Sequence, residues 1–204
     1  TATTVLAAPS AVATGGTYYI VGTTAAGCSD TTAVTVTVNP KPTVVTNAPA
    51  AVCQPTTVDL TAAAVTAGST AGLTYTYFTD ATATTVLAAP SAVATGGTYY
   101  IVGTTAAGCS DTTAVTVTVN PKPTVVTNAP AAVCQPTTVD LTAGAVTAGS
   151  TAGLTYTYFT DATATTVLAA PSAVATGGTY YIVGTTAAGC SDTTAVTVTV
   201  NPKP

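Results

Sequence analysis

Residues 73–78 read Leu-Thr-Tyr-Thr-Tyr-Phe, a strict alternation of large apolar side chains with threonine. In an extended backbone successive side chains point to opposite faces, so Leu73, Tyr75 and Tyr77 share one face. A period of two with aromatic residues is typical of a strand that is buried on one face only. Residues 115–119, Val-Thr-Val-Thr-Val, have the same period. The sequence therefore predicts β-structure.

Further short segments rich in β-branched or aromatic residues lie on both sides of this stretch. We expect strands at residues 44–45, 58–60, 86–87 and 98–102. Gly and Pro, which favour turns, separate these segments. About six or seven short strands with frequent turns predict an all-β fold, an antiparallel β-sandwich of immunoglobulin type.

Residues 97–101, Gly-Thr-Tyr-Tyr-Ile, resemble the tyrosine corner of the immunoglobulin fold, in which a tyrosine stands two residues before a core cysteine. Ile101 occupies the place of that cysteine. The core disulfide of antibody domains is therefore not expected, and the cysteines of this chain must have another role.

The chain consists of repeats. Residues 1–42 recur unchanged at 82–123 and at 163–204, and residues 43–81 recur at 124–162 with Gly144 in place of Ala63. The period is 81 residues, which suits a small independent β-domain. We expect the C-terminal half of one repeat at 1–39, full repeats at 40–120 and 121–201, and the start of a further joint at 202–204.

The repeats are separated by Asn-Pro-Lys-Pro, at residues 39–42, 120–123 and 201–204. Two prolines in three residues favour an extended, stiff backbone and exclude a central strand. We interpret this segment as a short semi-rigid joint, which also contains every lysine of the chain: Lys41, Lys122 and Lys203.

The composition excludes most chemistry. Only 5% of residues are charged, where about 25% is typical, and the net charge is −4. The chain has no Arg and no His, so it offers neither a basic surface for nucleic acid nor the commonest general base and metal ligand. Thr, Gly or Pro interrupts every apolar run, so no membrane span is expected. We predict a protein that is not an enzyme, with no catalytic residue, no cofactor and no metal site.

The five cysteines occupy two positions of the repeat. One position follows a valine, and the other lies in the turn Gly-Cys-Ser-Asp: the first holds Cys53 and Cys134, the second Cys28, Cys109 and Cys190. Without His or a Cys-x-x-Cys pair they do not suggest zinc. We therefore expect disulfides, which form outside the cytosol.

Two pairings are open. Within repeats, Cys53 would join Cys109 and Cys134 would join Cys190, which leaves Cys28 unpaired; across joints, Cys28 would join Cys53 and Cys109 would join Cys134. If six strands alternate in direction, the two cysteines of a repeat lie at the same end of the sandwich. That count favours the pairing within repeats.

The aspartates are too sparse for a calcium loop. Turn-forming roles suit Asp80 and Asp111, and Asp59, inside an alternating segment, is expected to face water. Asp-Thr-Thr recurs in the repeats and resembles an O-glycosylation signal of Bacteroidetes-type bacteria, which implies possible sugar attachment at Thr31, Thr112 and Thr193.

The order of these segments resembles the immunoglobulin-like repeats of large cell-surface adhesins from Bacteroidetes-type bacteria, including those associated with gliding motility. The most specific elements are Val-Cys-Gln-Pro at 52–55 and Gly-Cys-Ser-Asp at 108–111. The resemblance implies export, through type IX secretion, and an extracellular or cell-surface location, with no catalytic residues.

We therefore expect a structural segment of an extracellular fibre or adhesin stalk that spaces or displays a binding tip. Few charges protect the sheet edges, so self-association into a filament is also expected, and a neighbouring chain could supply the strands that residues 1–39 lack. The alternative is a module that binds glycans or surfaces through loops and an outward-facing Tyr99 or Tyr100.

Overall fold

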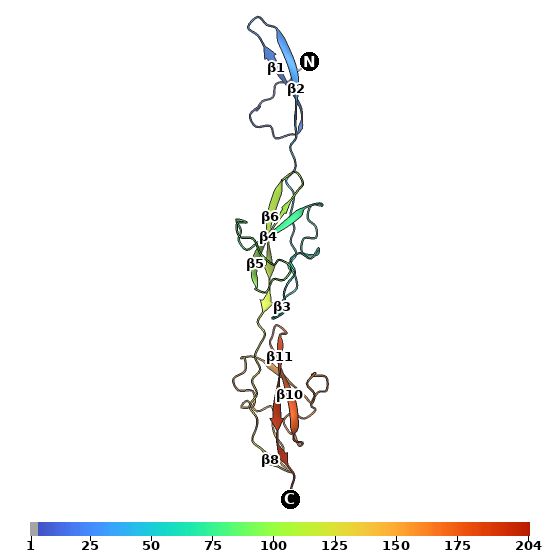
Figure 1. Ribbon diagram of the computed structural model, residues 1–204, viewed down its shortest axis with the longest axis vertical. Helices are drawn as coiled ribbons and strands as arrows, with labels where there is room; N and C mark the ends of the chain where they lie inside the picture. The colour runs from blue at the N-terminus through green and yellow to red at the C-terminus, as the bar shows by residue number, and fades with distance from the viewer. Residues whose placement is uncertain (1–3) are drawn as a thin grey trace. The chain divides into compact units, whose positions relative to one another are not determined.

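The computed structural model describes residues 4–204, and their regular secondary structure consists of β-strands (Figure 1). No helix of the described residues is long and apolar enough to cross a membrane. The chain divides into two compact units. The first comprises residues 4–47, Ala63–Leu87 and Tyr99–Val115; the second comprises Ala48–Ala62, Ala88–Thr98 and Thr116–Pro204.

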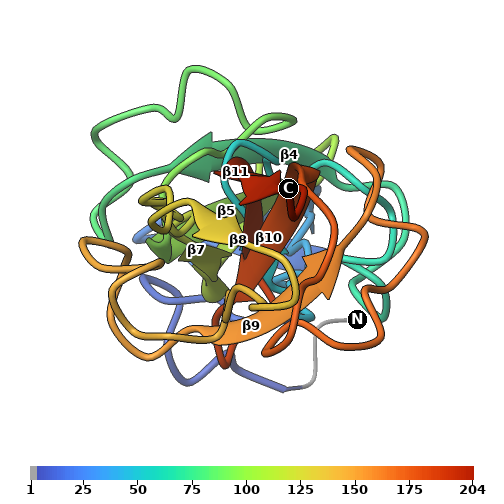
Figure 2. The same ribbon diagram turned by 90° about the horizontal axis from the view of Figure 1, so that it is seen from below.

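The second unit contains one complete repeat. Its strands are β8 (Val133–Cys134), β9 (Thr155–Phe159), β10 (Gly178–Thr185), β11 (Ser191–Val198) and β12 (Val200–Asn201). Strands β9, β10 and β11 form an antiparallel sheet with β10 in the centre (Figure 2), whereas β12 pairs in parallel with β8. A single bridge from Val139 to Val174 belongs to the opposite side of the sandwich.

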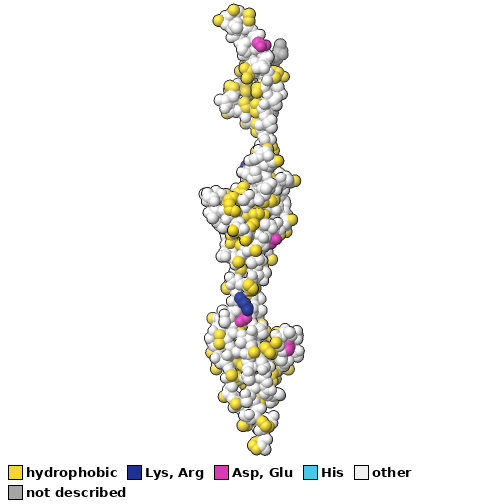
Figure 3. Space-filling model, viewed as in Figure 1, with side chains coloured by type: hydrophobic (Ala, Val, Ile, Leu, Met, Phe, Trp, Pro, Cys, Tyr) yellow, Lys and Arg dark blue, Asp and Glu magenta, His cyan; other side chains and the backbone are white. Residues whose placement is uncertain are grey.

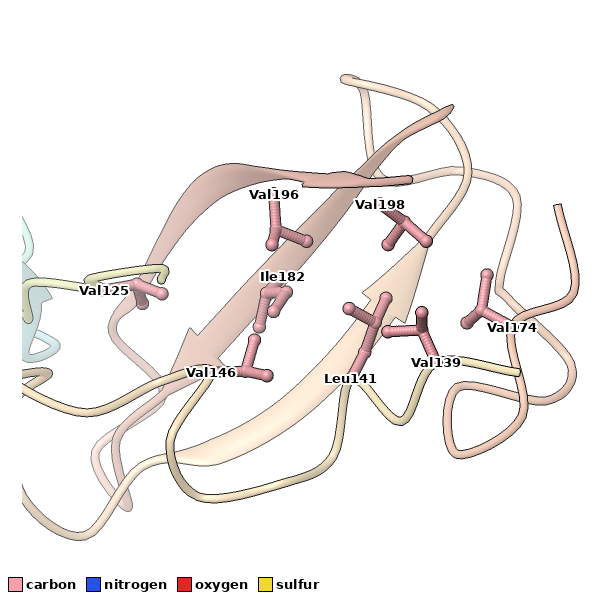
Figure 4. Close-up of a cluster of buried hydrophobic side chains, with 8 residues drawn as sticks. All are labelled: Val125, Val139, Leu141, Val146, Val174, Ile182, Val196 and Val198. Atoms are coloured by element: carbon pink, nitrogen blue, oxygen red, sulfur yellow. The ribbon is translucent and has the colours of Figure 1, made fainter. Parts of the chain in front are cut away.

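The core of this repeat lies between the two sides. Leu141 and Ile182 are 0% exposed, and in β11 the buried Val196 and Val198 flank the exposed Thr197. Figure 4 shows these side chains pointing toward one another from the sheet and from the opposing segments. The cluster consists of Val125, Val139, Leu141, Val146, Val174, Ile182, Val196 and Val198.

The tyrosine corner is present. The Tyr180 hydroxyl donates a hydrogen bond of 2.9 Å to the Thr176 carbonyl, four residues upstream. Ile182, two residues after the tyrosine, is fully buried where antibody domains have a cysteine. The predicted all-β, immunoglobulin-like sandwich is confirmed.

The preceding repeat has the same arrangement. Its strands are β3 (Val52–Cys53), β4 (Thr74–Phe78), β5 (Gly97–Thr104), β6 (Ser110–Val117) and β7 (Val119–Asn120). Strands β4, β5 and β6 form one sheet, and β3 pairs in parallel with β7. The predicted alternation is observed in β4, whose threonines are exposed and whose tyrosines are half-buried.

Three predicted strands, at residues 44–45, 58–60 and 86–87, are absent as regular strands. At 58–60 a single bridge joins Val58 to Val93. At residues 44–45 the backbone is bonded by side chains, since the Val44 N–H donates to Asp111 Oδ2 at 3.0 Å and the Val45 N–H to Ser69 Oγ at 2.9 Å. At 86–87 there is a single bridge from Val86 to Phe78, and Val86 is 60% exposed. The prediction of strands at these places was therefore wrong.

Residues 4–39 form a hairpin of β1 (Gly16–Thr23) and β2 (Ser29–Val36). Ile20 in β1 is 60% exposed, whereas its equivalents Ile101 and Ile182 are 0% exposed. The hairpin has the same sequence as the later strands, so its exposure shows that the segments at 43–81 and 124–162 close the core over β5 and β10.

The three isoleucines provide a matched stability test. We expect Ile182→Ala to destabilise the second unit by about 2–5 kcal/mol, because it leaves a cavity in a closed core. The same change at Ile20 alters stability by less than about 0.5 kcal/mol, because that side chain is exposed. Urea unfolding followed by circular dichroism measures both; equal effects would contradict the assignment of the core.

Candidate functional site: the joint between repeats

The joint at residues 120–123 is held by an ion pair. Lys122 Nζ lies 2.7 Å from Asp192 Oδ1, and the side chains are 51% and 18% exposed. The other carboxylate oxygen, Asp192 Oδ2, accepts a hydrogen bond of 3.0 Å from the Val125 N–H. One carboxylate from the Gly-Cys-Ser-Asp turn therefore binds both the joint lysine and the backbone that follows it.

The joint at residues 39–42 repeats this geometry. Lys41 Nζ lies 2.6 Å from Asp111 Oδ1, and the Val44 N–H donates to Asp111 Oδ2 at 3.0 Å. The hydrogen bond from Lys41 lowers the pKa of Asp111, and Lys122 lowers the pKa of Asp192 in the same way. Both aspartates are therefore ionised at neutral pH, and each forms an ion pair with its lysine. Figure 3 shows how sparse charged side chains are elsewhere on the visible face of the molecule.

The aspartates do not all have the roles that the sequence predicts. Asp80 does form a turn, because its carboxylate accepts hydrogen bonds from the Thr84 and Thr85 N–H groups at 3.1 and 2.6 Å. A hydrogen bond from the Thr82 hydroxyl, together with these two, holds the pKa of Asp80 far below its usual range. Asp59 is exposed, as predicted. Asp111 instead binds the joint, so its predicted turn role was wrong.

A disulfide connects two repeats. Cys53 of the repeat at 40–120 is bonded to Cys190 of the repeat at 121–201, with a Cα–Cα distance of 5.5 Å and a sequence separation of 137 residues. Both cysteines belong to the second compact unit. Cys109 is a half-buried thiol, and Cys28 and Cys134 are exposed thiols.

This connectivity differs from both pairings considered from the sequence. The favoured bonds, Cys53–Cys109 and Cys134–Cys190, were wrong, and so were the alternatives, Cys28–Cys53 and Cys109–Cys134. Only Cys28 has the state that was predicted for it, that of an unpaired thiol.

The physical reason is the parallel pairing of β8 with β12. It places Cys134 opposite Asn201, at the end of the last strand, whereas Cys190 directly precedes β11 at its beginning. Eleven residues of strand separate these positions, which corresponds to about 36 Å at about 3.3 Å per residue. A disulfide requires Cα atoms within about 7 Å. The two cysteines of one repeat therefore lie at opposite ends and cannot bond to each other.

Cys109 lies at the corresponding place in the first unit. Its sulfur is 3.9 Å from the Asn39 carbonyl oxygen. Asn39 is the repeat equivalent of Asn120, which pairs with Cys53 in the β3–β7 ladder. At both joints, the cysteine of Gly-Cys-Ser-Asp is thus associated with the asparagine of Asn-Pro-Lys-Pro: Cys109 through the Asn39 carbonyl, and Cys190 through Cys53, the partner of Asn120.

The predicted glycosylation positions are accessible. Thr31, Thr112 and Thr193 are exposed, and each follows an aspartate of a Gly-Cys-Ser-Asp turn. Sugar attachment at these three residues stays a prediction.

The chain belongs to a family of Ig-like domains, described as "Ig-like domain CHU_C associated", which matches residues 41–121 and 122–202. No curated protein sequence matches this chain. The family is consistent with an extracellular or surface location, and its fold is typical of structural and adhesion modules.

Solved structures with a similar fold are only distantly related in sequence. A three-immunoglobulin segment of titin, a Glu-to-Ala variant, has a TM-score of 0.47 and 12% identity, covering 92% of this chain and 75% of that chain. Extracellular domains 3–5 of Drosophila OTK have a TM-score of 0.44 and 14% identity, covering 92% of this chain and 71% of that chain.

The disulfide can be mapped directly. Peptide mass spectrometry without reduction is expected to find Cys53 linked to Cys190, with Cys28, Cys109 and Cys134 labelled by a maleimide. Cys53→Ser opens a loop of 137 residues, so it lowers the free energy of unfolding by up to about 5 kcal/mol in the chain-entropy treatment. The control Cys134→Ser removes only a free thiol and leaves stability unchanged. A peptide linking Cys53 to Cys109 would refute the connectivity.

The ion pair predicts a pH dependence. Because the lysine lowers the folded-state pKa of Asp192, its stabilisation is present above the unfolded pKa of about 3.9 and is lost as the pH falls below it. Asp192→Asn should cost about 1 kcal/mol or less at pH 7, since Lys122 is half exposed, and progressively less as the pH falls and the aspartate takes up a proton. Asp30→Asn is the matched control, because Asp30 accepts a hydrogen bond from the adjacent Thr31 N–H and has no lysine partner among the described residues. Thermal melts at several pH values measure both; the same loss for both variants would contradict the role of the ion pair.

Proposed function

We propose that these repeats are structural spacers in an extracellular fibre or adhesin stalk, and that the segment has no enzymatic role. The observation that carries the proposal is the Cys53–Cys190 bond between neighbouring repeats. A disulfide inside a domain stabilises that domain alone, whereas a disulfide between repeats resists their separation. Such a bond is of use where tension acts along the chain.

The joint supports the same role. Lys122 is held by Asp192 across the Pro-Lys-Pro segment, and Lys41 is held in the same way by Asp111. Proline already restricts this backbone, and the ion pair adds a second restraint that recurs once per repeat. A module whose purpose was only to present a loop to a ligand would not need its joints fixed.

The disulfide also supports an extracellular location. Disulfides persist in oxidising surroundings and are rare in the cytosol. Family membership and the sparse charge of the surface fit a secreted or surface-attached protein. Self-association into filaments is part of the proposal, since sheet edges carry few charges that would prevent lateral pairing.

Binding of glycans through tyrosine is the less favoured role. The eight tyrosines of the two full repeats lie in strands, and each is buried or half-buried. The ring of Tyr99 is largely covered, at 9% exposed, and Tyr100 is half-buried, so neither offers a fully open face to a sugar.

Immunogold electron microscopy of native cells, with an antibody against the repeat, tests the proposed function. Label along extracellular fibres is the expected result, and label confined to the cell interior would refute it. Glycan-array binding that is lost in Tyr100→Ala would favour the other role instead.

Single-molecule stretching tests the mechanical part. When the oxidised chain is pulled by its two ends, the bond shields the 137 residues that it closes off. The fully stretched length should therefore be about 480 Å shorter than that of the reduced chain, at about 3.5 Å per residue. Cys53→Ser, which cannot form the bond, should give the same length with and without reductant. Equal lengths for the original chain would contradict the shielding.

A further inference from the structure

We propose that the Cys53–Cys190 bond is one rung of a continuous series, in which the Val-Cys cysteine of every repeat is bonded to the Gly-Cys-Ser-Asp cysteine of the repeat that follows. By this rule the partner of Cys134 is the Gly-Cys-Ser-Asp cysteine of a further repeat on the same chain. Cys109 correspondingly pairs with the Val-Cys cysteine of a complete preceding repeat. Each of the three free thiols, Cys28, Cys109 and Cys134, is thus one half of a disulfide whose other cysteine belongs to a neighbouring repeat.

Identical sequence around the two kinds of cysteine is the first support. Residues 40–62 recur as 121–143, so Cys134 has the same neighbours along the chain as Cys53. It also has the same strand pairing, because Val133–Cys134 lies parallel to Val200–Asn201 as Val52–Cys53 lies parallel to Val119–Asn120. The local structure in which Cys53 bonds to Cys190 is therefore present again around Cys134.

The geometry around Cys109 is the second, independent support. Its sulfur already faces the Asn39 carbonyl at 3.9 Å, and Lys41 is bound by Asp111 at 2.6 Å. The first joint thus has the same ion pair as the second, and its Gly-Cys-Ser-Asp sulfur likewise lies beside the asparagine of Asn-Pro-Lys-Pro.

The charges at the two ends of the segment agree with this rule. Lys203 belongs to the third Asn-Pro-Lys-Pro and Asp30 to the first Gly-Cys-Ser-Asp. Among the described residues they form no ion pair, whereas Lys41 and Lys122 are each bound by an aspartate. A following repeat would contain a Gly-Cys-Ser-Asp segment. Its cysteine would bond to Cys134, and its aspartate, two residues later, would pair with Lys203.

Each rung forms by oxidation of two thiols. The two cysteines lose two protons and two electrons, and an external disulfide accepts them and becomes two thiols. An oxidoreductase or oxidised glutathione of the extracellular compartment is the chemical class of oxidant that this requires. The connectivity is independent of the stalk role, since either could hold without the other.

The experiment adds one more copy of residues 124–204 after Pro204 of the full chain, folded in a glutathione redox buffer. Non-reducing peptide mapping should then find Cys53–Cys190 unchanged and Cys134 bonded to the Gly-Cys-Ser-Asp cysteine of the added copy. Maleimide labelling of Cys134 should fall from complete in the original chain to less than a tenth. In the control, that added cysteine is replaced by serine, and Cys134 stays fully labelled.

Three other outcomes are informative. A free Cys134 in the extended chain, or a bond between the two cysteines of one repeat, would overturn the rule. If the original chain instead forms disulfide-linked oligomers through Cys134 and Cys28, the pairing of the two kinds of cysteine still holds, and the Gly-Cys-Ser-Asp cysteine comes from a second chain. Fibre localisation is measured separately by immunogold microscopy, so failure of the map and failure of the proposed function are distinguishable.

Discussion

The parallel pairing of a two-residue strand with the end of the last strand is the constraint on which the rest of the structure depends. Val133–Cys134 lies beside Val200–Asn201, and Val52–Cys53 lies beside Val119–Asn120. This pairing sends one cysteine of each repeat to the end where the chain leaves, while the Gly-Cys-Ser-Asp turn holds the other at the end where the chain enters. The cluster of buried hydrophobic side chains contains neither cysteine of the repeat, so both are available for bonds to neighbouring repeats. The ion pair from Asp192 to Lys122 then fixes the segment between them.

Much of the fold was predictable from local pattern. The alternation in residues 73–78 and the Gly-Thr-Tyr-Tyr-Ile segment identify half-buried strands and the tyrosine corner, because side-chain period and the tyrosine hydrogen bond are local properties. The missing strand at 44–45 was not predictable in this way. Its N–H groups are bonded by Asp111 and Ser69, which are 67 and 24 residues away, and no periodicity records such partners.

The joint was only half predictable. Its stiffness follows from two prolines, but the bond across it depends on strand direction, which composition does not determine. Assuming that every strand alternates in direction put both cysteines of a repeat at one end, and a single parallel pair reverses that conclusion. The ion pair did leave a signal in the sequence. In a chain with 3 lysines and 7 aspartates, a lysine in every joint and an aspartate two residues after every turn cysteine are a recurring opposite-charge pair.

The proposed series of rungs would change how an array fails. Each bond closes 137 residues while the period is 81, so successive bonds overlap by 56 residues and every interior residue lies inside at least one loop. Reducing one disulfide would leave outside every loop only the 25-residue stretch between a turn cysteine and the next Val-Cys cysteine, such as Cys109 to Cys134. At about 3.5 Å per residue that stretch spans at most about 90 Å. Bonds inside each repeat would leave the joints between them unprotected, whereas bonds between repeats protect joint and domain together.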